Sequence, residues 1–453
     1  MLNKIKLTIN AFALECDKKF IHRKRLLSTT DILRYVMMLS CSPNETGKRV
    51  LDQCNSKRVS MTAIDKFRNK IEGVDLKSLF RAIVSTLPTN GNSIYNAFSQ
   101  RQVFAIDGSQ ITLDASLKGI YVTQSKTHYP RMYVSCLHNC TTNLVHDFET
   151  INVYDERKLA INHLKYIPKD AILVLDRGYH GQKLISACIE LKINFVVRLK
   201  CTAYKPYMKY TKGDNSKQSY DENMKVAYDG VDRDVRFVQY ELNGHTYSII
   251  TNLTCNTQIP KETICSLYHQ RWSVEEFYKT FKPTTTTTKD THSKKEQFVL
   301  QELYARLIMI HISKIIELDI VVSQRPQNKE FEPVNKFCFH KPKKNKVGVL
   351  YKMNMKRCMD KLKEVVLEKL LDVNTVDINI IIKSLTSELT KSAIEVRPKR
   401  SFPRLNKGAA NKYKHKESKA KAIVKLKNAQ KERRTNKTVK QPAVGKIKQS
   451  ENG

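Results

Sequence analysis

The stretch DAILVLDRGY, residues 170–179, joins a continuous apolar run to a charged end. Apolar residues that do not alternate with polar ones are typical of a strand buried on both faces of a sheet. Asp176 follows the run directly, and a carboxylate there is costly unless it leaves the core at the strand's end or binds a positive group. The stretch therefore predicts a central strand of a covered sheet with a carboxylate at its end.

The segments around this stretch alternate between strand and helix patterns. The expected strands are residues 103–113, 131–139, 143–154, 171–175 and 194–200, and the expected helices are residues 155–167 and 181–191. Strands that alternate with helices in this way indicate the α/β class, with helices on both faces of one sheet.

A second aspartate ends a similar apolar run. Asp107 follows FAI as Asp176 follows LVL, and α/β folds place their chemistry at strand ends. Gly108 and Gly178 come just after, and glycine permits a tight turn and the close approach of a substrate backbone. An aspartate that only caps a turn would give the same local pattern. The two acids together indicate a candidate site, while turn capping stays open for either one alone.

The segment YHQRWSVEEFYKTFK, residues 268–282, is expected to form one helix. At about 100° per residue, five chemically active side chains fall within roughly 80° of arc. They are Tyr268, Arg271, Glu275, Lys279 and Lys282. An ordinary amphipathic helix with a solvated charged face would show the same stripe. The stripe indicates a site only in combination with the two aspartates.

Three carboxylates and no convincing set of soft ligands favour a hard metal ion. Oxygen ligands suit Mg²⁺ or Mn²⁺, and two such ions about 4 Å apart can activate an attacking oxygen and stabilise a leaving one in phosphoryl transfer. We therefore expect Asp107, Asp176 and Glu275 to hold two such ions. The candidates for gripping phosphates beside them are Arg271, Lys279 and Lys282.

The composition points to a polyanionic partner. The chain has 453 residues, 41% of them hydrophobic, and 80 Lys and Arg against 44 Asp and Glu give a formal charge of +36. That excess favours nucleic acid as the partner. No apolar run approaches the roughly 18 residues of a membrane span, and the N-terminus lacks a signal-peptide pattern. We expect a cytoplasmic, nucleoid-associated protein without a membrane partner.

The eleven cysteines are scattered and form no CxxC pair, which fits reduced thiols. The pattern CLHNC would place Cys136, His138 and Cys140 on one face of a strand as half of a zinc site. No second cluster of Cys and His completes a tetrahedral set, so zinc is disfavoured.

The expected domain organisation follows from changes in secondary-structure pattern and composition along the chain. Residues 1–100 read as short helices with a basic surface, either a DNA-binding region or a structural subdomain. Residues 101–320 form the expected catalytic domain, with a β-rich insertion at about 201–260 that contains an Asn243-Gly244 hairpin turn. Residues 321–396 are expected to be helical, and residues 397–453 a basic disordered tail.

The elements IDGS, LDRGY and Y-x2-R-x3-E-x6-K resemble those of the IS4 family of insertion-sequence transposases, over residues 28–316. The resemblance implies an RNase H-like mixed sheet with flanking helices, interrupted by a β-rich insertion. It also implies a catalytic DDE triad at Asp107, Asp176 and Glu275. The signature tyrosine, arginine and lysine of the family fall on Tyr268, Arg271 and Lys282, and together with Lys279 these are the residues expected to contact DNA. The run PTTTTT at 283–288 departs from the family pattern after the lysine.

The resemblance further implies cut-and-paste DNA transposition. Water would cleave a strand at each terminal inverted repeat, and the freed 3′-hydroxyl would attack target double-stranded DNA. Family members act as homodimers in a synaptic complex. Three alternatives remain. They are a decayed transposase that binds DNA without cutting it, another RNase H-like nuclease, and a basic RNA- or membrane-binding protein, for which the sequence offers no aromatic stacking motif and no basic amphipathic helix.

Overall fold

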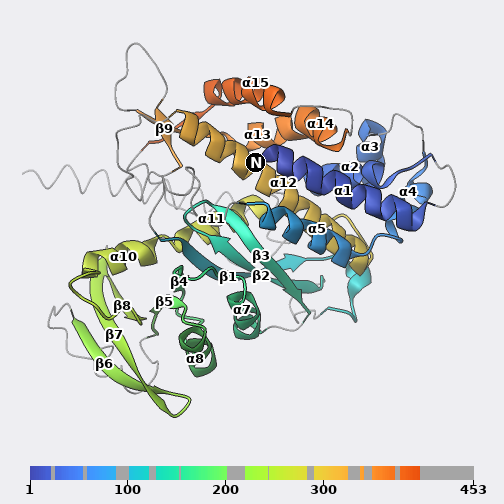
Figure 1. Ribbon diagram of the computed structural model, residues 1–453. Coiled ribbons are helices and arrows are strands. Elements are labelled where there is room, and N and C mark those ends of the chain that lie inside the picture. The colour runs from blue at the N-terminus through green and yellow to red at the C-terminus, as the bar shows by residue number, and fades with distance from the viewer. Residues whose placement is uncertain are drawn as a thin grey trace, which may run out of the picture. The chain divides into compact units, whose positions relative to one another are not determined.

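The centre of the computed structural model is an eight-stranded sheet in the order β3-β2-β1-β4-β5-β8-β7-β6 (Figure 1). The strands are β1 (Val103–Thr112), β2 (Arg131–Asn139), β3 (Leu144–Ile151), β4 (Ile172–Leu175), β5 (Asn194–Arg198), β6 (Asp221–Tyr228), β7 (Val231–Leu242) and β8 (His245–Thr251). The first three strands pair antiparallel, and β1, β4 and β5 run parallel. This mixed sheet confirms the expected RNase H-like α/β fold.

The structure describes residues 1–21, 26–54, 59–87, 101–121, 129–152, 155–200, 220–242, 244–282, 290–324, 337–340, 349–372 and 378–397. The chain divides into two units, Met1–Val396 and Arg397–Gly453. The threonine run at residues 283–288 lies outside the described residues, and so does the expected basic tail except for residue 397.

Side-chain alternation along the central strands explains why the sheet needs cover on both faces. Ile172 and Val174 of β4 belong to one buried cluster, whereas Leu173 and Leu175 belong to another. Successive side chains of a strand point to opposite faces, so a continuous apolar run fills two cores. The strand expected at residues 171–175 is confirmed as buried on both sides.

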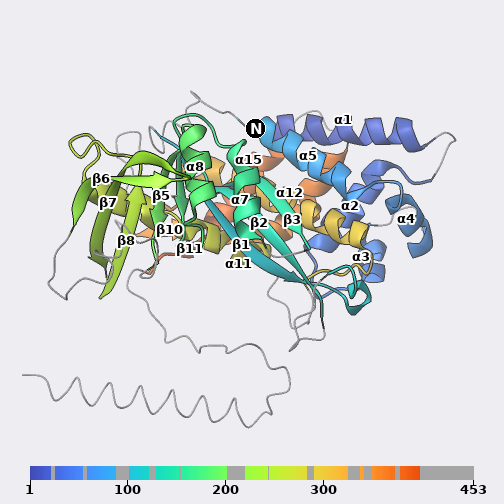
Figure 2. The same ribbon diagram turned by 90° about the horizontal axis from the view of Figure 1, so that it is seen from below.

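Helices cover the two faces unequally. The helices α7 (Glu156–Leu164) and α8 (Gln182–Glu190) lie on one face, in front of the sheet when it is seen from below (Figure 2). The other face carries α5 (Gly73–Ser85), α10 (Lys261–His269), α11 (Trp272–Phe281) and α12 (Glu296–Ser323). The candidate site is built where α11 crosses β1 and β2.

The β-rich segment after β5 extends the main sheet. Strand β8 pairs antiparallel with β5, and β7 and β6 follow in the same sheet. The expected hairpin is present between β7 and β8. Gly244 in its turn has a φ of 74°, a left-handed conformation that glycine adopts readily. Asn243 and residues 201–219 lie outside the described part of the chain.

The N-terminal helices form a group that packs on α12 mainly through α2 and α5. They are α1 (Leu2–Phe20), α2 (Thr29–Ser40), α3 (Gly47–Cys54), α4 (Met61–Arg68) and α5. Ser28 caps α2 in a capping box: its hydroxyl accepts a hydrogen bond from Asp31 N, and the Asp31 carboxylate accepts one from Ser28 N at 2.9 Å. Both α2 and α5 contact α12, which is buried around most of its circumference.

The segment after α12 is only partly helical. It contains α13 (Met355–Lys361), a π-helical turn (Leu362–Val366), α14 (Leu367–Leu371) and α15 (Ile378–Lys391). It also contains β9 (Phe339–His340), β10 (Leu350–Lys352) and β11 (Ile394–Glu395), which form a small antiparallel sheet. Strands of two or three residues are too short to show the alternation that reveals a strand in sequence. Among the described helices, none has the length and apolar content to cross a bilayer.

Candidate active site

The register between β1 and β4 brings the two aspartates together. Ile106 of β1 is paired with Leu175 of β4, and this is the last pair between the two strands. Asp107 and Asp176 are the residues that directly follow this pair along the chain. Adjacent strands lie about 4.8 Å apart. The two carboxylates therefore start from neighbouring positions at the carboxyl end of β4.

The local structure around Asp107 differs from the expected strand end. The strand β1 continues to Thr112, paired with β2 along its whole length, so Asp107 lies inside a strand and Gly108 does not form a turn. A Cβ at Gly108 would lie 3.0 Å from Glu156 Oε1, so the glycine makes room for that carboxylate. Asp176 does begin a turn, in which Tyr179 N donates to Asp176 O at 3.0 Å.

The helix α11 holds Glu275 above these strands. Its apolar side, with Val274, Phe277 and Phe281, is buried, and the Tyr278 hydroxyl donates a hydrogen bond to Asp107 O at 2.8 Å. Glu275 on the other side remains 30% exposed. Packing of one face of α11 thus turns Glu275 toward the accessible end of the sheet.

The expected single helix over residues 268–282 is wrong. The chain forms two helices, α10 and α11, separated at Gln270 and Arg271. Around the break the backbone uses bonds of the tighter i→i+3 type, including Arg271 N to Tyr268 O at 3.1 Å and Val274 N to Arg271 O at 3.2 Å. Periodicity alone cannot reveal such a break, because it changes the phase of the helix only slightly.

Tyr268 and Arg271 connect this break to the carboxylates. The Tyr268 hydroxyl donates to Asp176 Oδ1 at 3.2 Å, and Arg271 Nη2 donates to Glu275 Oε1 at 2.5 Å. Arg271 is only 11% exposed at its side chain. Burial disfavours its charge, but the hydrogen bond to Glu275 and the field of Asp176 outweigh burial and raise the pKa of Arg271.

The carboxylate of Asp107 is poorly compensated. Burial raises the pKa of Asp107 to about 6. The hydrogen bond from Gly108 N, at 2.9 Å, and the nearby Arg271 guanidinium oppose that rise, whereas Glu275 and Glu156 add to it. A shifted carboxylate beside other acids is typical of a functional site and indicates a place where additional positive charge would be stabilising.

The two lysines of the stripe point to different surroundings. Lys279 is about half exposed, forms an ion pair with Glu276, and lies 5.7 Å from the centre of the Trp272 ring. Lys282 lies just beyond α11, where burial lowers its pKa. The structure thus brings Tyr268, Arg271 and Glu275 together with Asp176, but leaves Lys279 on an exposed face of α11.

Glu156 is a candidate that the sequence analysis missed. It is the first residue of α7, and its carboxylate lies between the backbones of Gly108 and Gly178, 3.9 Å from where a Cβ of Gly178 would be. A buried cluster fixes α7: His163 Nδ1 lies 2.8 Å from Asp147 Oδ2, and His163 Nε2 lies 3.1 Å from Ser135 Oγ. The sequence did contain a signal: an acidic residue begins the helix that lies, along the chain, between the strand of Asp107 and the strand that precedes Asp176.

A row of aromatic rings, also missed, links the insertion to Asp176. Tyr240 of β7 is opposite Tyr247 of β8 in register, and their rings stack at 5.2 Å. Tyr247 makes an edge contact of 6.1 Å with Tyr268, and Arg198 lies 4.4 Å from the centre of the Tyr247 ring. The predicted hairpin already sets Tyr240 opposite Tyr247, but the contacts of Tyr247 with Arg198 and Tyr268 depend on the placing of β8 beside β5 and of α10, which the sequence does not show.

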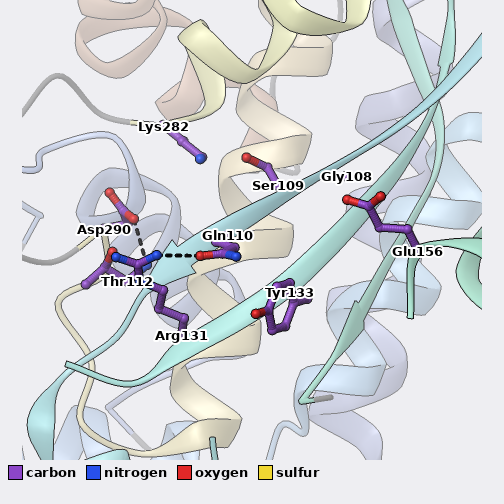
Figure 3. A pocket seen from close by; sticks show the side chains of 9 residues that line it. All are labelled: Gly108, Ser109, Gln110, Thr112, Arg131, Tyr133, Glu156, Lys282 and Asp290. Atoms are coloured by element: carbon purple, nitrogen blue, oxygen red, sulfur yellow. Dashed lines mark hydrogen bonds between the residues drawn. The ribbon is translucent and has the colours of Figure 1, made fainter. Parts of the chain in front are cut away.

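A polar pocket of about 590 Å³ is lined by Gly108, the residue that follows Asp107 (Figure 3). Its lining residues are Gly108, Ser109, Gln110, Thr112, Arg131, Tyr133, Glu156, Lys282 and Asp290. Within the described part of the chain, no group of three or more His, Cys, Asp or Glu side chains is arranged to hold a metal ion. The Arg271 guanidinium instead provides the positive charge near Asp107 and Asp176.

An RNase H-like sheet that carries two neighbouring aspartates and a helix-borne glutamate defines a candidate phosphoryl-transfer domain. Residues 98–312 match the family model described as "Transposase DDE domain". This match agrees with the likeness to IS4-type DDE transposases that the sequence motifs show.

The chain is similar to two named transposases. It is 24% identical over 193 residues to Transposase InsG for insertion sequence element IS4, from Escherichia coli (strain K12). That match covers 41% of this chain and 43% of the relative, so less than half of the curated relative is spanned. It is also similar to a structure of the piggyBac transposase synaptic complex with hairpin DNA, with a TM-score of 0.43 and 11% identity. That match covers 90% of this chain and 87% of the piggyBac chain.

Proposed function

We propose that the chain catalyses cut-and-paste transposition of DNA by metal-dependent strand cleavage and strand transfer. The observation that carries the proposal is the register that sets Asp107 beside Asp176, beneath Glu275 of α11, inside a domain that matches DDE transposases. Asp107, Asp176 and Glu275 are its proposed catalytic residues.

The donor chemistry of this site fits Mg²⁺ or Mn²⁺, because all three groups are carboxylates and Asp107 is short of compensating positive charge. Asp107, Asp176 and Glu275 would hold two such ions. When bound, the ions would activate the attacking oxygen and stabilise the leaving oxygen. Glu275 would have to exchange part of its contact with Arg271 for this role, because the two side chains now form a close ion pair.

The remaining signature residues have separable roles in this proposal. Tyr268 orients the Asp176 carboxylate through its hydroxyl. Arg271 and Lys282 would bind phosphates beside the reacting bond, and the planar guanidinium can make two parallel hydrogen bonds to one phosphate. Lys279 would contact DNA farther from the reaction, because it is exposed and already paired with Glu276.

The proposed partners are the terminal inverted repeats of the element and the target double-stranded DNA, bound by a homodimer that brings two ends together. The formal charge of +36 supports a partner of this kind. Within the chain we assign end binding to the N-terminal region, residues 1–100, and catalysis to residues 101–320. Residues 321–396 form a C-terminal region, and residues 397–453 supply nonspecific charge.

The test is incubation of the purified protein with Mg²⁺ and DNA that carries the inverted repeats flanking its own gene. We expect cleavage at the repeat ends and their joining to a target plasmid. Binding without cleavage would identify a decayed transposase. Cleavage without joining would favour another RNase H-like nuclease. Failure to bind or cut these ends would contradict the proposal.

A further inference from the structure

The second half of β1 has one edge that no described strand covers. β4 pairs with β1 only as far as Ile106, whereas β1 continues beside β2 from Asp107 to Thr112. At the far end Asp290 closes the gap, since Thr112 N donates to its carboxylate at 2.7 Å and Asp290 N donates to Thr112 O at 2.9 Å. The polar pocket occupies the space between Asp107 and this closure.

Two cations enter this pocket from different elements. Arg131 begins β2 and is paired with Thr112 in register, and Lys282 follows α11. Figure 3 shows both side chains directed toward the space beside Ser109 and Gln110. Neither cation forms an ion pair with a carboxylate of the described residues at 4.0 Å or less, so their charges are available to an anion.

The surroundings of the two cations favour an anion between them. Burial disfavours the charged form of Lys282, and the positive charge of Arg131 disfavours it further, although Asp290 and Asp107 partly offset this. Arg131 Nη1 donates to Gln110 Oε1 at 2.6 Å, which fixes the guanidinium without neutralising it. Two like charges that line one pocket repel each other until an anion compensates them.

Apart from the carboxylates of Glu156 and Asp290, the other lining groups are neutral, and they and the position of the pocket identify the class of anion. Ser109, Gln110 and Tyr133 bring hydroxyl and amide groups, which together with Arg and Lys are the usual partners of DNA phosphates. Gln110 lies three residues from Asp107 along β1, roughly 10 Å at 3.4 Å per residue. That distance is within reach of the next few nucleotides of a strand whose reacting phosphate lies at Asp107.

We propose that this pocket binds a backbone phosphate of the reacting DNA strand close to the scissile bond, with Arg131 as the contact that the signature motif does not supply. This inference rests on the proposed function, because the strand can reach the pocket only if its reacting phosphate lies at the carboxylates. Arg131, held by Gln110, fixes the direction in which the strand leaves the site.

The experiment pairs changes in the protein with changes in single phosphates. The full chain, as wild type or Arg131→Ala, is titrated with repeat-end DNA in which one phosphate at a time is replaced by an uncharged methylphosphonate. Arg131→Lys tests the two-pronged contact. Arg357→Ala is the matched control, because Arg357 is about half exposed, is paired with Glu388, and lies on α13, which packs on α12 and α15.

We expect Arg131→Ala to weaken binding of unmodified ends about ten-fold, the scale of a hydrogen bond to a charged group, and to reduce the log-log salt slope by about 0.9. At one phosphate position near the scissile bond, the methylphosphonate should weaken wild type about as much but add little to the loss in Arg131→Ala. Arg131→Lys should fall between the two proteins.

Three results would overturn the inference. In the first, the loss of affinity from Arg131→Ala and the loss from each methylphosphonate simply multiply at every position. In the second, Arg357→Ala weakens binding as much as Arg131→Ala does. Either result means that the pocket does not hold a phosphate. A melting temperature of Arg131→Lys equal to wild type shows that the fold persists in the comparison. In the third, the wild type cuts its ends and Arg131→Ala binds and cuts them equally well, which refutes only the phosphate site in the pocket. A wild type that neither binds nor cuts the ends refutes the proposed function as well.

Discussion

Burial of the Asp107 carboxylate lowers the stability of the folded protein at neutral pH. Its pKa is raised to about 6 from an ordinary 3.8, so the folded protein binds this proton more tightly than the unfolded chain does. The resulting loss of stability is absent below pH 3.8, grows as the pH rises toward 6, and is fully present above it. A site prepared for a cation is expected to carry such a cost when the cation is absent.

We therefore predict that Asp107→Asn abolishes cleavage but stabilises the metal-free protein by up to about 3 kcal/mol at pH 7.5. The amide oxygen can still accept the hydrogen bond from Gly108 N. Thermal melts at pH 7.5 and pH 4 check this, because the gain should disappear at the lower pH. Glu276→Gln, at an exposed and paired position, should stay within about 0.5 kcal/mol at both. Equal stability of Asp107→Asn and wild type at pH 7.5 would contradict this account of Asp107.

At the same scale, Arg271 should not be replaceable by lysine. Arg271→Lys removes the guanidinium that donates to Glu275 and that we propose to hold a phosphate through two hydrogen bonds, so we expect single-turnover cleavage to fall at least ten-fold with saturating DNA. Lys279→Ala is the control and should keep a near-normal rate, because exposed helix pairs contribute only about 0.3–0.5 kcal/mol. Similar rates in Arg271→Lys and wild type would return the stripe to an ordinary solvated helix face.

At the scale of elements, α7 is held by buried polar contacts as well as by apolar packing. His163 lies between Asp147 and Ser135, and all three side chains are almost fully buried. Arg81 of α5 also donates to Asp147, at 2.9 Å. The cluster thus joins the C-terminal end of α7 to β2, β3 and α5, and so anchors the helix whose first residue, Glu156, lies beside Gly108.

His163→Ala should therefore reduce the free energy of unfolding by about 3 kcal/mol, because it removes buried packing and leaves polar partners unpaired. Urea unfolding at pH 7 measures the change. His269→Ala is the control, as that histidine closes α10 at an exposed position. A loss of less than about 1 kcal/mol in His163→Ala would show that the cluster does not anchor α7.

Sequence patterns predicted the helices and strands better than the places where they begin, end or break. The strand at residues 171–175 was predicted correctly because burial on two faces sets its apolar pattern. The break at Arg271 and the continuation of β1 past Asp107 escaped, since both depend on neighbours distant in the chain. The same reason hid Glu156 and Arg131, whose relation to Asp107 appears only once α7 and β2 are placed on β1.

At the scale of the whole molecule, α12 connects the N-terminal helices to the edge of the site. Arg68 of α4 donates to Gln301 at 2.9 Å. Arg306 is buried and donates to three carbonyls, Ser40 O at 2.9 Å, Phe281 O at 3.3 Å and Asp290 O at 2.9 Å. One guanidinium therefore joins the end of α2, the end of α11 and the segment that closes the pocket.

We predict that Arg306→Met lowers the free energy of unfolding by about 3 kcal/mol or more, because several buried carbonyls lose their donor at once. Cleavage at a temperature where the variant remains folded should also fall, since Phe281 precedes Lys282. Arg357→Ala, at an exposed ion pair, is the matched control and should change stability by less than about 0.5 kcal/mol. A variant as stable as wild type would mean that α12 holds these segments by apolar packing alone.

The central claim is that three carboxylates from β1, β4 and α11 perform metal-dependent DNA cleavage. Its most direct test is single-turnover cleavage of repeat-end DNA with Mg²⁺ by Asp107→Asn, Asp176→Asn and Glu275→Gln, with Glu276→Gln as the neighbouring control and end binding measured in parallel. The account predicts that each of the three variants binds ends within a few-fold of wild type but shows no detectable cleavage, while Glu276→Gln cuts at a near-normal rate. Cleavage that persists in any of the three, or a Glu276→Gln variant as inactive as Glu275→Gln, would contradict it.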